Sequence, residues 1–135
     1  MALAKDRLIK RRDGVDFSDP MAATTTIYAG ALVCLNAAGN AVPGSTATTL
    51  IARGVATEYV ANTGSAGDKS VPTRAGVFNF KNSTSTDEIT RAEIGDNCYI
   101  VDDETVAKTN GSTTRSIAGK IIDLDSAGVW VSIGR

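Results

Sequence analysis

The chain has 135 residues, of which 42% are hydrophobic and 21% are charged, a size and balance typical of a single globular domain. It contains no histidine and only two cysteines, which excludes histidine-based acid–base catalysis, serine–histidine nucleophiles, and histidine-ligated or four-cysteine metal sites. The formal net charge is −1, but residues 1–12 carry five of the fourteen basic side chains and one of the fifteen acidic ones, so the remainder is acidic.

The first twenty residues predict an extended basic N-terminal arm, residues 1–20, ahead of a body that spans residues 21–135. Gly14 and Pro20 interrupt regular structure in this stretch. Phe17 is its one large apolar side chain after the basic run. The candidate partner-binding residues are therefore the basic side chains of the arm and this phenylalanine: Lys5, Arg7, Lys10, Arg11, Arg12 and Phe17.

A basic arm on an acidic body indicates an anionic partner. Nucleic acid, an acidic protein surface and a neighbouring copy of the chain all satisfy this condition. The alternative is a solvated tail without a partner. Phe17 either docks in a groove of the partner or closes the arm onto its own body.

The body is a succession of short runs rich in β-branched and apolar residues, separated by turn residues at regular spacing. One helical turn is expected at residues 90–95. In the last run Val129, Val131 and Ile133 fall on one face of a strand. The sequence predicts an all-β fold, a small β-sandwich or barrel. The expected strands cover residues 24–28, 31–35, 50–60, 69–74, 77–81, 98–101, 106–108, 115–124 and 129–133.

Glycines mark a weak internal repeat. Gly30 and Gly95 each precede a strand, and Gly54 and Gly119 each interrupt a later apolar run; 65 positions separate the members of both pairs. The tripeptide Ser-Ala-Gly also recurs before a final strand in each half. The repeat predicts two similar β-units packed on each other.

Motifs that resemble chemical sites are incomplete. The run Gly64–Ser70 lacks the glycine that precedes the lysine of a phosphate-binding loop, and Asp123–Gly128 lacks the final glutamate of a calcium loop. The acidic run Asp102–Glu104 fits a hairpin tip. Cys34 and Cys98 lie in apolar strands and are expected to be buried and reduced. We expect no enzyme activity, cofactor or metal.

The order of the segments YAGALVCL, IARGVATEYV, AGDKSVPTRAGV, IGDNCYIVDDETV and SIAGKIIDLDSAGVWVSI is similar to that of the head-decoration, or capsid cement, proteins of tailed bacteriophages and prophages. The resemblance covers residues 22–133. It implies a β-rich protein on the outer face of the capsid, usually a homotrimer, that bridges subunits of the major capsid protein. It transfers no binding residues to particular positions, so the site residues depend on the arm.

The expected function is therefore that of a structural virion protein, assembled in the host cytoplasm and located on the capsid exterior. No apolar run is long enough to span a membrane, and no apolar segment follows the charged start of the chain. The alternative is a β-barrel module that binds nucleic acid or carbohydrate. Nucleic acid is the less expected partner because the body is acidic and aromatic residues make up only 5% of the chain.

Overall fold

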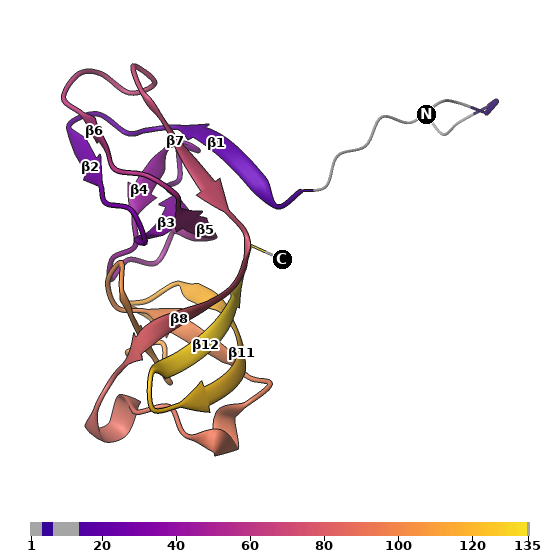
Figure 1. Ribbon diagram of the computed structural model, residues 1–135, viewed down its shortest axis with the longest axis vertical. Helices are drawn as coiled ribbons and strands as arrows, with labels where there is room; N and C mark the ends of the chain where they lie inside the picture. The colour runs from indigo at the N-terminus through magenta and orange to yellow at the C-terminus, as the bar shows by residue number, and fades with distance from the viewer. Residues whose placement is uncertain (1–3, 7–13, 135) are drawn as a thin grey trace.

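The structure, a computed structural model, describes residues 4–6 and 14–134 (Figure 1). The described chain is all-β, as the sequence predicts, with twelve strands and two single-turn 3-10 helices, η1 (Ser85–Asp87) and η2 (Arg91–Glu93). The strands are β1 (Asp16–Pro20), β2 (Thr25–Ile27), β3 (Leu32–Leu35), β4 (Ala41–Pro43), β5 (Ile51–Ala56), β6 (Val60–Asn62), β7 (Ser70–Arg74), β8 (Gly76–Asn82), β9 (Asn97–Ile100), β10 (Thr105–Ala107), β11 (Ile117–Asp125) and β12 (Gly128–Ile133).

The first seven strands form an upper unit, coloured indigo to magenta in Figure 1. Five of them make an antiparallel sheet in the order β1-β7-β5-β3-β4, and β2 pairs with β6 in a separate two-stranded ribbon. Short turns rich in glycine, asparagine and serine connect the strands and favour this arrangement. A small core of fully buried side chains fills the unit: Met21, Ile27, Val33, Ala41 and Val71.

The last five strands form a lower unit, a closed barrel in the order β10-β8-β12-β11-β9. Neighbouring strands are antiparallel except β10 and β8, which are parallel. The predicted alternation of the final strand is confirmed, because Val129, Val131 and Ile133 are fully buried in the barrel core. Trp130 and Ser132 lie on the other face of β12 and are only partly buried.

The two units share one strand order, which confirms the predicted repeat. The order β1-β7-β5-β3-β4 of the upper unit corresponds to β8-β12-β11-β9-β10 of the lower unit. In the lower unit the two end strands pair and close the barrel. In the upper unit the equivalent contact is one parallel bridge, between Met21 and Ala41. The upper unit is therefore an open version of the lower barrel.

Strand β3 belongs to both units. Leu32 and Cys34 are fully buried in the barrel core, whereas Val33, between them, is fully buried in the core of the upper unit. Side chains alternate across a strand, so a run that is apolar on both faces serves one core on each side.

Hydrogen bonds across the seam between the units support this shared packing. The amide of Leu32 donates to the carbonyl oxygen of Asp103 at 2.8 Å. The amide of Leu50 donates to Ser116 Oγ at 3.0 Å, and Ser116 Oγ donates to the carbonyl oxygen of Ala47 at 2.7 Å. The two units consequently form one body with two cores.

One strand departs from the sequence-based expectation. Strands were expected only after Pro20, but β1 pairs with β7 along its whole length, from Asp16 opposite Arg74 to Pro20 opposite Ser70. The expectation is wrong because aspartate and proline favour turns locally, whereas pairing with β7 decides the conformation here. Residues 16–20 are therefore a strand of the body rather than part of an arm.

Close backbone approach explains the repeated glycines. A Cβ atom at Gly54 would lie 2.6 Å from the carbonyl oxygen of Arg74, and one at Gly119 would collide with the carbonyl oxygen of Ser132. Both glycines lie where the pairing register shifts, in β5 opposite β3 and in β11 opposite β9. A β-bulge at equivalent positions of the two units thus needs a residue without a side chain.

We expect Gly54→Ala and Gly119→Ala each to lower the free energy of unfolding by about 1–3 kcal/mol, because backbone atoms have little room to move. Chemical denaturation of both variants measures the effect. The control is Ser45→Ala, in an exposed loop, which we expect to change stability by less than about 0.5 kcal/mol. Glycine variants as stable as this control would contradict the packing described.

Candidate partner-binding surfaces

The predicted site residues fall into two groups. Arg7, Lys10, Arg11 and Arg12 lie outside the described residues. Lys5 is described and exposed, and Phe17 is half-buried in β1.

Phe17 packs against its own body. The guanidinium carbon of Arg53, in β5, lies 3.6 Å from the centre of the Phe17 ring, a cation–π contact. The same guanidinium binds Asp19 through two hydrogen bonds, Nε to Oδ2 at 2.8 Å and Nη2 to Oδ1 at 3.2 Å. Arg53 therefore reaches across β7 and fixes one face of β1. Of the two expectations for Phe17, this placement corresponds to the one in which its ring packs against the body of its own chain.

The other side of β1 is a free sheet edge. The amide of Met21 donates to the carbonyl oxygen of Lys69, and the amide of Ala75 donates to that of Val15, so the odd-numbered residues of this segment bond to β7. Ser18 lies opposite Pro72, which has no amide hydrogen to donate. The backbone groups of Asp16 and Ser18 therefore point away from β7, where no strand of the described chain pairs with them.

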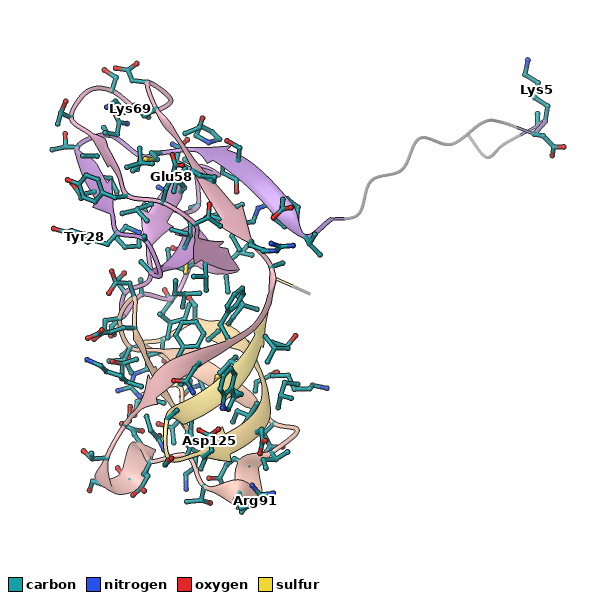
Figure 2. All side chains as sticks on the ribbon, in the orientation of Figure 1. Lys5, Tyr28, Glu58, Lys69, Arg91 and Asp125 are labelled. Atoms are coloured by element: carbon teal, nitrogen blue, oxygen red, sulfur yellow. The ribbon has the colours of Figure 1, made fainter. Side chains whose placement is uncertain are left out.

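Two of the three tyrosines form an exposed aromatic pair that the sequence did not reveal. Tyr28 follows β2 and Tyr59 precedes β6, so they continue the register that places Ile27 opposite Val60. Their ring centres are 5.3 Å apart, and the side chains are 63% and 56% exposed. Figure 2 shows Tyr28 at the outer side of the upper unit. Only the strand register brings these two residues together, so sequence spacing gives no signal for the pair.

The acidic run Asp102–Glu104 is the turn between β9 and β10, as expected for a hairpin tip. Glu104 accepts a hydrogen bond from Lys81 Nζ at 2.9 Å. Partial burial, together with the neighbouring carboxylate of Asp102, raises the pKa of Asp103. In the described chain no group of three or more histidine, cysteine or acidic side chains is placed to hold a metal ion.

Cys34 and Cys98 are both buried in the core shared by β3 and the barrel, and they are not joined in a disulfide. Burial raises the pKa of each thiol to about 12. Because the thiolate is the reactive form, both cysteines have low reactivity in the folded protein. They act as small core side chains.

The chain was compared with known protein families, proteins and structures. No protein-family model, curated protein or solved structure matches the chain. Among the residues that the structure describes, no helix has the length and apolar character needed to cross a membrane.

We expect Asp103→Asn to stabilise the protein at neutral pH by less than about 1 kcal/mol, since the side chain is only partly buried and solvent screens part of the electrostatic effect. A raised pKa means that the folded state holds this proton more tightly than the unfolded chain, so stability falls as the pH rises through the raised pKa. The asparagine variant avoids this loss, and its advantage should vanish below the ordinary aspartate pKa of 3.8. Thermal unfolding across a series from acidic to neutral pH tests this. Asp96→Asn serves as the exposed control, and a less stable Asp103→Asn at neutral pH would refute the electrostatic interpretation.

We also expect both thiols to resist a thiol-specific reagent in the native protein and to react fully in denaturant, because burial keeps them protonated and covered. The double variant Cys34→Ala, Cys98→Ala should fold with a loss of about 1–2 kcal/mol, as for other small core changes. Absorbance of the released reagent group measures the reaction. Rapid modification of the folded chain would show that the shared core opens more readily than its packing implies.

Proposed function

We propose that the protein is a structural virion protein that binds the outer face of a phage capsid and bridges capsid subunits. The observation that carries this proposal is the free edge of β1, which follows directly on the basic N-terminal segment of the chain. A free edge offers main-chain hydrogen bonds to an extended segment of a partner. The basic side chains that precede β1 in the sequence would attract carboxylates of that partner.

The build of the body supports a mechanical role. The two units share β3, and seam hydrogen bonds connect them, so a force on one unit is transmitted to the other. The closed barrel offers no free edge in the described chain, which leaves strand addition to the upper unit. Many weak attachments of this kind over a capsid lattice add up through multivalency.

Exposed apolar side chains support contacts with proteins. Six large hydrophobic residues are at least 45% exposed: Tyr28, Ile51, Tyr59, Val77, Ile117 and Ile122. Tyrosines are enriched at protein interfaces because they combine a large apolar ring with a polar tip. In the proposed role these surfaces face capsid subunits or other copies in a homotrimer. The partner is the major capsid protein, and no enzymatic step is part of the role.

The alternative, a module that binds carbohydrate or nucleic acid, has one specific observation in its favour. The exposed Tyr28–Tyr59 pair is an aromatic surface on which a sugar ring or a base can stack. The acidic body opposes a polyanion, and the edge of β1 has no role in such binding. We therefore prefer the structural role.

The test uses purified protein and empty capsids of the phage that encodes it. We expect the full chain to decorate capsids without DNA and to behave as a trimer in light scattering. Deletion of residues 1–12 should raise the apparent Kd by roughly tenfold at low salt and by less at high salt, because rim charges act mainly through salt-sensitive association. This deletion leaves β1 intact, whereas removal of residues 1–20 would also remove a strand of the sheet.

A matched pair of variants tests the edge itself. Ser18→Pro removes an outward amide hydrogen without touching the β7 ladder, and Ser18→Ala retains it. We expect only the proline variant to weaken attachment, with unchanged circular dichroism in both. Phe17→Ala is a poorer test, because it also removes the ring that Arg53 covers. Failure of the full chain to bind capsids, or salt-dependent DNA binding in its place, would refute the proposed function.

A further inference from the structure

An open groove lies at the seam between the two β-units. It has a volume of about 980 Å³ and is lined by residues from β3, β5, β9, β11 and β12, together with the loop before β11. Both units thus contribute to one concave surface. Because β3 and the seam hydrogen bonds hold the units together, the shape of the groove is set by the fold.

Two exposed isoleucines give the groove an apolar centre. Ile51 and Ile117 are 66% and 50% exposed, and each is the first residue of its strand, β5 or β11. The preceding residues, Leu50 and Ser116, are joined by a 3.0 Å hydrogen bond, so the two strands begin close together at the seam, and both isoleucines line the groove.

The charge of the groove is opposite to that of the body. Arg53, Arg115 and Lys120 line it, and none of its described lining residues is acidic. The carboxylates that pair with the arginines, Asp19 and Asp87, are outside the lining. Lys120 is exposed and forms no ion pair with any described residue. Among the described lining residues, Lys120 therefore brings an unpaired positive charge to the groove, whereas ion pairs partly offset the charges of Arg53 and Arg115.

We propose that this groove binds an extended polypeptide segment of another protein that carries aliphatic side chains flanked by carboxylates. The aliphatic side chains contact Ile51 and Ile117, and the carboxylates face Lys120 and the arginine edges. A small molecule fits less well, because ligand sites enclose most of their ligand and this groove is open. A nucleic acid strand uses the cations but leaves the isoleucine pair without an apolar partner. The proposal concerns a surface separate from the edge of β1 and does not require a capsid.

The test is a titration of the isotope-labelled full chain with a short synthetic peptide of glutamate, leucine and valine, followed by NMR. We expect the methyl signals of Ile51 and Ile117 to shift, with the signals of Val60, in the β2–β6 ribbon of the upper unit and outside the groove, unchanged. Three further probes separate the contributions: the same peptide with lysine in place of glutamate, polyglutamate, and a single-stranded oligonucleotide. We expect each of them to bind at least about tenfold more weakly, since each loses either the charge match or the apolar contact.

Matched variants assign the site. Lys120→Glu should weaken binding of the acidic peptide by about tenfold, whereas Lys69→Glu, at the far end of the upper unit, should have no effect (Figure 2). Ile51→Thr and Ile117→Thr should each weaken binding by roughly fivefold or more, whereas Tyr59→Thr, in the upper unit and outside the groove, should not. All these positions are exposed, so the variants should retain the wild-type circular dichroism spectrum.

Several outcomes would overturn the proposal. These are the absence of methyl shifts with the acidic peptide, equal binding of the lysine peptide, and tighter binding of the oligonucleotide. Binding that persists in the Lys120 and isoleucine variants would likewise place the contact elsewhere. None of these results bears on capsid attachment through β1, so the two proposals fail separately.

Discussion

The fold depends on one strand that is buried on both faces. β3 supplies Leu32 and Cys34 to the barrel core and Val33 to the core of the upper unit. In a chain of this length each unit alone would have a marginal core, because small domains bury a smaller share of their surface. Sharing a strand lets two small cores support each other. The seam, the groove beside it and the orientation of the upper sheet all follow from this arrangement.

The difference between the two units determines which strand edge is left unpaired. In the lower unit β10 pairs with β8, so the barrel closes and the backbone groups at the two strand edges are hydrogen-bonded. In the upper unit the same closure is limited to the bridge between Met21 and Ala41, which leaves the edge of β1 open over its length. Edge strands that are left open promote association, and natural proteins usually protect them with charge or proline. β1 has both, in Asp16 and Pro20, which fits an edge that accepts a specific partner and resists indiscriminate pairing.

Much of the fold was predictable from sequence because its turns are marked by glycine, asparagine and aspartate. The final hairpin, the turn at Asp102–Glu104 and the repeat with Gly54 and Gly119 all correspond to elements of the structure. β1 was not predictable, since its residues favour turns and its strand conformation comes from pairing with β7. The contact of Arg53 with Phe17 is equally tertiary, because it joins strands that are far apart in sequence.

The candidate surfaces were less predictable than the fold. Composition identified the basic segment, but four of its five basic residues lie outside the described chain, so their role stays a prediction. The Tyr28–Tyr59 pair and the isoleucine pair depend on strand register and on the seam between units. A single sequence contains no periodic signal for either. The residues that define a surface are thus recognisable only once the strands are placed.

Amide hydrogen exchange of the full chain, free and bound to capsids, tests the role of the β1 edge most directly. In the free protein we expect the outward amides of Asp16 and Ser18 to exchange quickly, and the amides of β3 to exchange slowly because opening them disrupts both cores. On capsids the β1 amides should become protected, while β3 should stay as slow as before. Unchanged exchange at Asp16 and Ser18 in the bound protein would show that the partner does not add to this edge, and would contradict the mechanism.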